Sequence, residues 1–185
     1  MPDIPHILLT SVNNLGDCVL FLPVVAAARA AFPQGRIILL TGAAGADAAR
    51  LTGLPDDVLP LPPSRRHPPR AALLRLLPRL RRERFDLGVM ASGDSSFVAA
   101  LLRLSGARER AGFDDCAARF LLTRRVSARE PEHEARRNLR LASALGWPVS
   151  DARPPCGIPS ALREEARTLL TRAGAPPEAG PPVVL

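Results

Sequence analysis

The chain of 185 residues contains no lysine and no tyrosine, and all 25 of its basic residues are arginine. Cysteine is scarce: Cys18, Cys116 and Cys156 are odd in number, widely spaced and without a CxxC pair. This argues against a disulfide framework and against a zinc site, and it fits a reducing cytoplasm. No apolar run reaches the ~18 residues that a membrane span needs, and no secretory signal is visible. We expect no metal and no cofactor.

Aromatic residues are also few, with six Phe and one Trp, and the arginines are spread over many segments. Both features disfavour a nucleic-acid-binding protein, which stacks bases on aromatic rings beside a basic groove. The net charge of +7 suits anionic partners such as lipid head groups or phosphorylated sugars, and equally a solvated basic surface. An apolar fraction of 46% is ample for a core, and the length suggests one domain with the edge of a second.

The segment from His6 to Pro23 organises the rest of the chain. An apolar run within residues 6–10 predicts a buried strand, a polar turn covers residues 11–17, and an apolar pattern up to Ala31 predicts a helix. Strand, tight loop and helix open a βαβ unit, and ligands of open α/β sheets bind at the carboxyl ends of the strands. The loop therefore lies where chemistry is expected.

Two residues of this loop have chemistry of their own. Gly16 can take a positive φ and lets a ligand approach the backbone. Asp17 stands at the start of the helix, where a carboxylate is favoured either as a cap or as a functional group. The dinucleotide fingerprint G-x-G-x-x-G and the Walker Gly-Lys-Ser/Thr are both absent.

The remaining pattern alternates short apolar runs with helical segments, which predicts a doubly wound, mostly parallel α/β sheet of about six strands. Expected strands lie at 36–41, 58–61, 86–90, 109–112 and within 119–126, and expected helices at 46–52, 70–84, 97–104, 132–145 and 161–173, with a turn at 42–45 and a linker at 149–159. The helix 70–84 is amphipathic and rich in arginine. It is either a surface for anionic membrane or an ordinary helix covering the sheet.

Further polar candidates follow other strands. Ser92, Asp94 and Ser95 lie in a second loop at a strand end, and they can bind sugar hydroxyls or cap the next helix. By the same geometry this loop and the loop 13–17 should line one site. His133, at the start of the helix 132–145, can contact an acceptor molecule or be a surface residue near a cap.

The order of the motifs resembles the bacterial heptosyltransferases, glycosyltransferase family 9. The likeness rests on segments that follow one another as in that family: Asn13-Asn14-Leu15-Gly16-Asp17, Pro23, Phe32-Pro33, Phe85 to Val89, Leu101 to Gly112, and His133 to Gly146. It covers nearly the whole chain and only the N-terminal half of the family's proteins. It implies a Rossmann-like, acceptor-side domain of a GT-B enzyme over residues 1–148. Residues 149–185 are then a linker, a helix and the first strand of a missing donor-binding domain.

The resemblance also implies a reaction. Asp17 is the expected base of an inverting transfer from ADP-heptose to a lipopolysaccharide inner-core acceptor, with the donor bound only when a C-terminal domain is present. Asn13, Asn14, Gly16, Ser92, Asp94, Ser95 and His133 are the expected acceptor-binding residues. The protein is expected in the cytoplasm, with peripheral contact to the inner membrane.

One departure from the family pattern stands six residues before Asp17. Ser11 replaces the usual Lys or Arg, so a cation that would contact phosphate or carboxylate is missing there. A non-catalytic or vestigial sugar-binding domain is the alternative interpretation.

Overall fold

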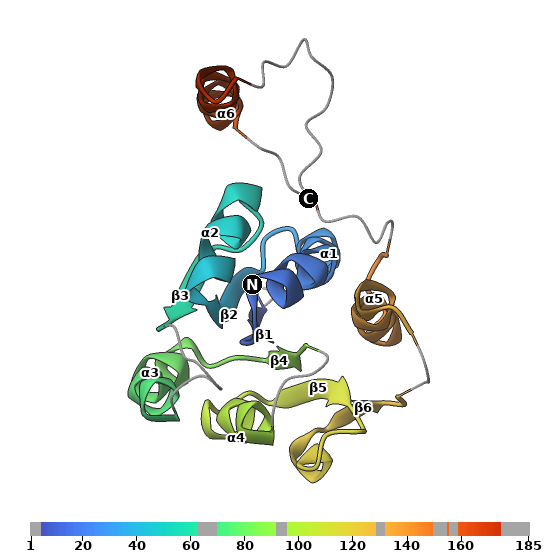
Figure 1. Ribbon diagram of the computed structural model, residues 1–185. Coiled ribbons are helices and arrows are strands. Elements are labelled where there is room, and N and C mark those ends of the chain that lie inside the picture. The colour runs from blue at the N-terminus through green and yellow to red at the C-terminus, as the bar shows by residue number, and fades with distance from the viewer. Residues whose placement is uncertain are drawn as a thin grey trace. The chain divides into compact units, whose positions relative to one another are not determined.

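The computed structural model describes residues 5–62, 70–91, 96–128, 132–149, 155 and 159–174. Six strands form one sheet in the order β3-β2-β1-β4-β5-β6, and all neighbouring strands run parallel (Figure 1). The strands are β1 (His6–Ser11), β2 (Arg36–Gly42), β3 (Asp57–Leu61), β4 (Leu87–Met90), β5 (Glu109–Phe113) and β6 (Arg124–Val126). The doubly wound parallel sheet predicted from the sequence is confirmed.

Six α-helices and one 3₁₀ helix accompany the strands in the described residues. They are α1 (Leu15–Ala31), α2 (Ala43–Thr52), α3 (Arg70–Glu83), α4 (Ser96–Leu104), η1 (Arg119–Leu121), α5 (Glu134–Ala144) and α6 (Ser160–Arg172). Helices α1, α2 and α5 cover one face of the sheet, and α3 and α4 cover the other (Figure 1). No described helix is both long and apolar enough to cross a membrane.

The central strands β1, β2 and β4 are buried on both faces because they are largely continuous apolar runs. Alternate side chains of a strand point to opposite faces, so Ile7 and Leu9 of β1 join the core under α1, whereas Leu8 joins the core under α3 and α4. All three are at most 1% exposed. Runs of this kind are typical of parallel strands with helices on both sides.

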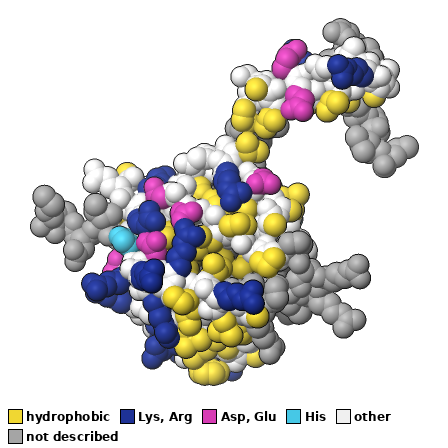
Figure 2. Space-filling view, turned by 90° about the vertical axis from the view of Figure 1, so that its left-hand side faces the viewer, with side chains coloured by type: hydrophobic (Ala, Val, Ile, Leu, Met, Phe, Trp, Pro, Cys, Tyr) yellow, Lys and Arg dark blue, Asp and Glu magenta, His cyan; other side chains and the backbone are white. Residues whose placement is uncertain are grey.

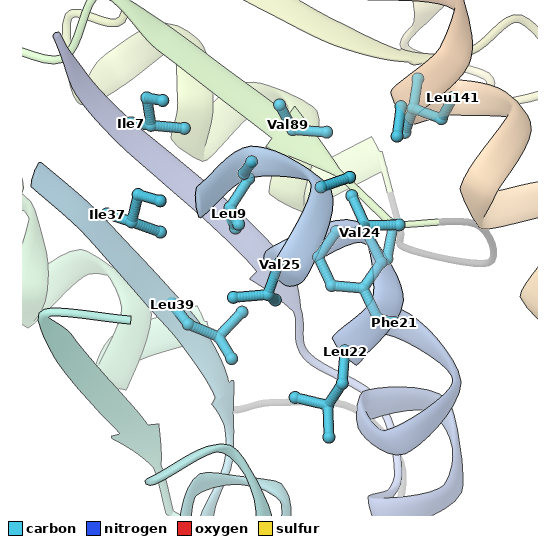
Figure 3. Close-up of a cluster of buried hydrophobic side chains, with 14 of the residues drawn as sticks. Ile7, Leu9, Phe21, Leu22, Val24, Val25, Ile37, Leu39, Val89 and Leu141 are labelled. Atoms are coloured by element: carbon cyan, nitrogen blue, oxygen red, sulfur yellow. The ribbon is translucent and has the colours of Figure 1, made fainter. Parts of the chain in front are cut away.

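Helix α1 supplies the centre of the larger core. Phe21, Leu22, Val24 and Val25 are fully buried and meet side chains of β1, β2, β4 and α5 (Figure 3). Helix α5 packs beside α1 on this face. This packing fixes the first turn of α1 at the carboxyl edge of the sheet, where the candidate site lies.

The expected turn at 42–45 is wrong, because α2 begins at Ala43, directly after β2. Two glycines allow this close connection. A Cβ at Gly45 would lie 2.7 Å from both the Cβ of Cys18 and the Oγ1 of Thr41, and one at Gly42 would lie 3.1 Å from the carbonyl oxygen of Asn13. The glycines thus let α2 pack against α1 and the β1–α1 loop instead of making a turn.

Two further helix starts also differ from expectation. Helix α5 begins at Glu134 with His133 as its N-cap, not at residue 132, and α6 begins at Ser160 with Pro159 in the N-cap position. The expected helix 161–173 therefore starts one residue earlier, at Ser160. The other boundaries differ by one or two residues, as the ends of elements commonly do.

By internal contacts the chain forms two compact units, Met1–Pro155 and Cys156–Leu185. Within the second unit, α6 buries none of its side chains. The functional division at residue 148 that we expect from the sequence remains a prediction.

Arginine side chains are prominent on the face that carries α3 (Figure 2). Acidic side chains lie beside several of them, and hydrophobic side chains gather below. Arg79 of α3 pairs with Asp57 at 2.5 Å, and Arg36 pairs with Glu83 at 2.8 Å. These two arginines are therefore already paired within the protein.

Candidate functional site

The candidate site lies at the carboxyl ends of β1 and β4, the point at which the strand order reverses. Strand β1 pairs with β2 on one side and β4 on the other, and the helices after β1 and β4 lie on opposite faces. The backbone N–H of Ala91, just past β4, donates to the carbonyl oxygen of Thr10 at 3.0 Å. Ligands of open α/β sheets bind in the crevice at such a switch point.

Asn14 and Asp17 form the start of α1. Asn14 is the N-cap residue, and the backbone N–H of Asn14 donates to Oδ2 of Asp17 at 3.1 Å, which is one half of a capping box. Asp17 thus lies in the first turn and not at the cap position. A carboxylate here is stabilised by the positive end of the helix dipole. The capping contact is present, and a catalytic role for Asp17 stays a prediction.

Gly16 does not take the positive φ that the sequence allowed. It lies inside the first turn of α1 and is not among the described glycines with positive φ. A Cβ added at Gly16 would meet nothing within 4 Å, and the residue is exposed. The fold therefore does not need glycine at this position, and its lack of a side chain leaves the backbone of the first turn open to solvent.

The second polar loop lies outside the described residues, so the structure does not place Ser92, Asp94 and Ser95. Of their flanking residues, Ala91 directly follows β4 and Ser96 begins α4. The prediction that this loop and the loop 13–17 line one site therefore stays open, although β1 and β4 are neighbours.

His133 is the N-cap of α5, at the same edge of the sheet. Its Nδ1 accepts a hydrogen bond from the N–H of Ala135 at 3.3 Å, which requires that this nitrogen carry no proton. The imidazole is exposed. The structure thus gives His133 a capping role, and contact with an acceptor remains a prediction.

The sequence did not indicate that a pair of arginines on α5 forms a binding feature. The guanidinium carbons of Arg137 and Arg140 lie 4.7 Å and 5.1 Å from the ring centroid of Phe113, the last residue of β5. Arg137 pairs with Asp115, and Arg140 pairs with Glu132 at 2.9 Å. No spacing rule links Phe113 to α5, so only the fold reveals this cluster.

Arg137 retains a donor that the described residues do not use. Its Nε is buried and has no hydrogen-bond partner among them, although the side chain as a whole is 20% exposed. An unused buried N–H of a charged group is costly, and an oxyanion would satisfy it. Within the described ranges no group of three or more His, Cys, Asp or Glu could hold a metal ion.

The carboxyl edge of the sheet therefore carries an open helix N-terminus with Asp17 and, on a neighbouring helix, stacked guanidinium groups. With the parallel sheet and its switch point, this defines a Rossmann-like α/β domain with a polar site at the carboxyl edge. No family model matches the chain, and no curated protein matches it in sequence.

Solved structures do match it. The glycosyl transferase family 9 protein from Veillonella parvula shares 18% of its sequence, with a TM-score of 0.72 over 93% of this chain and 50% of that one. E. coli ADP-heptose lps heptosyltransferase II shares 17%, with a TM-score of 0.70 over 90% of this chain and 50% of that one. E. coli heptosyltransferase WaaC with ADP-2-deoxy-2-fluoro heptose shares 19%, with a TM-score of 0.64 over 80% and 51%.

These likenesses establish the fold: the chain has the Rossmann-like fold found in family 9 glycosyltransferases and heptosyltransferases. The chain spans about half the length of these structures.

Proposed function

We propose that this chain is the acceptor-side domain of a family 9 glycosyltransferase. The enzyme transfers a heptose from ADP-heptose to a lipopolysaccharide inner-core acceptor with inversion at the anomeric carbon. The observation that carries the proposal is the position of Asp17, at the carboxyl end of β1 and the first turn of α1, in a fold shared with heptosyltransferases. Donor binding and transfer require a second, donor-binding domain.

In the proposed reaction Asp17 acts as the base. Its carboxylate takes the proton from an acceptor hydroxyl while that oxygen bonds to the anomeric carbon, and the bond from this carbon to ADP breaks with its electron pair leaving on the diphosphate. A carboxylate can do this when it lies within hydrogen-bond reach of the hydroxyl. The open backbone at Gly16 leaves room for the acceptor beside it.

The arginines of α5 suit an acidic acceptor sugar. Ser11, which stands where the family has a cation, is 1% exposed and cannot replace that charge. We propose that Arg137 supplies it from α5 by donating to an acceptor carboxylate or phosphate. Guanidinium forks bind such oxyanions with two parallel hydrogen bonds.

The acceptor half of the proposal can be tested on the 185-residue chain. A deacylated, Kdo-carrying core oligosaccharide should saturably shift the amide NMR signals of Asn14, Gly16 and Asp17. Arg137→Gln should weaken this binding by about tenfold or more, as expected for loss of a charge-assisted hydrogen bond of about 1.5–3 kcal/mol. The matched control Arg50→Gln changes an exposed arginine on α2 and should bind normally. Absence of saturable shifts at the start of α1 would contradict the proposal.

A lipid-linked acceptor would bring the domain to the inner membrane surface. Helix α3 suits such contact because Leu74, 48% exposed, shares the helix with exposed Arg75 and Arg82. Pelleting with anionic vesicles should be weaker for Leu74→Ser than for the unaltered chain, and equal pelleting would remove this part of the proposal.

A further inference from the structure

A cavity lies at the opposite edge of the sheet from the candidate site. It has a volume of about 360 Å³ and is lined by Arg81, Arg84, Phe85, Ser105, Gly106 and Arg108. These residues come from the ends of α3 and α4 and from the segments that enter β4 and β5. The cavity is thus at the amino ends of the strands and shares no residue with the acceptor-side cluster.

The charges around this cavity do not balance. Three arginines line it, and Asp86 is the carboxylate that pairs with one of them, Arg108, at 3.2 Å. Arg81 donates from Nε to the carbonyl oxygen of Leu104 at 2.9 Å, which leaves its charge uncompensated. The side chain of Arg84 has neither an ion pair nor a hydrogen bond with any residue that the structure describes.

The negative end of α4, which would repel an anion, is already satisfied. The carbonyl oxygens of its last turn accept from donors as follows: Leu101 from the N–H of Ser105, Leu102 from the hydroxyl of Ser105, Arg103 from the N–H of Gly106, and Leu104 from Arg81. The terminal N–H groups of Arg81 and the whole guanidinium of Arg84 remain as donors toward the cavity. The chemistry offered to a ligand is therefore that of hydrogen-bond donors with positive charge.

The backbone at Arg84 adds an independent indication. Arg84 has φ +52, and it is the non-glycine residue with positive φ among those described. It follows the last residue of α3, a position where the left-handed conformation is common and glycine is usual. Arginine is strained there, and strained residues concentrate at functional sites. Glycine would end the helix with less strain, so helix termination does not explain why an arginine stands at position 84.

We propose that this three-arginine pocket binds a phosphoryl group. Planar guanidinium groups match the oxygens of phosphate, and several of them around one cavity select a multiply charged anion over a single carboxylate. The inference is independent of the proposed glycosyl transfer, because it uses neither Asp17 nor the arginines of α5.

The test uses the 185-residue chain with inorganic phosphate and pyrophosphate as probes, at constant ionic strength. Both should saturably shift the amide signals of Arg84, Ser105 and Gly106, with pyrophosphate binding more tightly. Arg84→Gly removes the cation and suits the local φ, so the variant should fold with an equal or higher melting temperature and bind pyrophosphate at least tenfold more weakly. Arg50→Gln, an exposed arginine on α2 outside the cavity lining, is the control and should bind normally.

Vesicles containing phosphatidylglycerol distinguish a lipid source of the phosphoryl group from a soluble one. Arg84-dependent shifts with pyrophosphate but no Arg84-dependent vesicle binding would indicate a soluble phosphate ester, and Arg84-dependent vesicle binding would indicate a head group. No saturable shift with either probe, or equal weakening by Arg84→Gly and Arg50→Gln, would overturn the proposal. Failure here leaves the oligosaccharide titration at Asn14 and Asp17 unaffected, so the two proposals fail separately.

Discussion

At the scale of single residues, the hydroxyl groups of two buried threonines near the carboxyl edge of the sheet have opposite effects on stability. Thr10 and Thr41 are both 0% exposed. The hydroxyl of Thr10 donates to the carbonyl oxygen of Val89 at 3.3 Å, whereas Oγ1 of Thr41 has no hydrogen-bond partner among the described residues. A buried hydroxyl without a partner costs about 1–3 kcal/mol.

We therefore expect Thr41→Val to raise the free energy of unfolding by about 1 kcal/mol, because valine keeps the shape and removes the desolvated hydroxyl. Thr10→Val is the matched control and should lower it by a similar amount, because it breaks a made hydrogen bond. Urea unfolding of both variants measures the difference. If Thr41→Val were as destabilising as Thr10→Val, the hydroxyl of Thr41 would have to have a partner in solution, such as a buried water.

Residue-scale features were predictable only in part. The position of Asn14, Gly16 and Asp17 at a strand end followed from the apolar run before them and the helical pattern after them. The role of Gly16 did not follow, because a sequence shows that glycine can take a positive φ but not whether it does so. Likewise, the strain at Arg84 has no signature in the sequence, since arginine is an ordinary helix former.

At the scale of elements, the carboxylate of Asp56 links the end of α1 to the starts of β2 and β3. Oδ2 of Asp56 accepts from the N–H of Ile37 at 2.7 Å and from Nη2 of Arg29 at 2.6 Å. Burial raises the pKa of Asp56, but the hydrogen bonds from Ile37 and Arg29 outweigh it, so the pKa of this carboxyl lies below its ordinary value. A lowered folded-state pKa means that the stabilisation is present above the unfolded pKa of about 4 and is lost as pH falls through the folded value.

Asp56→Asn should accordingly be less stable than the unaltered chain at pH 7 and nearly equal to it near pH 2. The gap at pH 7 should be about 1 kcal/mol, because solvent exposure of the carboxylate screens the ion pair. Both proteins should still lose stability in acid, since the hydrogen bond from Arg36 also lowers the pKa of Glu83. Urea unfolding at the two pH values measures the gap. A gap of the same size at pH 2 would show that packing, not ionisation, explains it.

The elements themselves were largely predictable, because buried parallel strands are continuous apolar runs and the helices between them are periodic. The errors occurred where packing overrides local signals. The sequence Gly42-Ala43-Ala44-Gly45 has the composition of a turn, yet the close approach of α2 to Cys18 and Thr41 makes it a helix start. The pairing of Phe113 with α5 could not be predicted, since it depends on which helix returns beside the end of β5.

At the scale of the whole molecule, the sheet separates two kinds of polar chemistry. The carboxyl edge carries Asp17, His133 and Arg137. The amino edge carries the three-arginine pocket. The fold explains the first, because the carboxyl ends of parallel strands and helix N-termini meet there. The fold does not require the three-arginine pocket at the amino edge, so the presence of this pocket points to a function.

The central claim is that Asp17 is the base of a glycosyl transfer and not merely part of a helix cap. The most direct measurement is turnover of Asp17→Asn in the two-domain enzyme, with ADP-heptose and a Kdo-carrying acceptor. The amide oxygen of asparagine can still accept the N–H of Asn14, so only a charge–dipole term of about 0.3–1 kcal/mol is lost from folding. Asp47→Asn, an exposed change of the same chemistry on α2, is the control.

We expect Asp17→Asn to lower turnover by roughly 10²–10⁴ while its melting temperature stays close to that of the control, because a positioned base contributes about this factor. Near-normal turnover of Asp17→Asn with an unchanged melting temperature would show that Asp17 is not the base and would leave it as part of the capping box of α1.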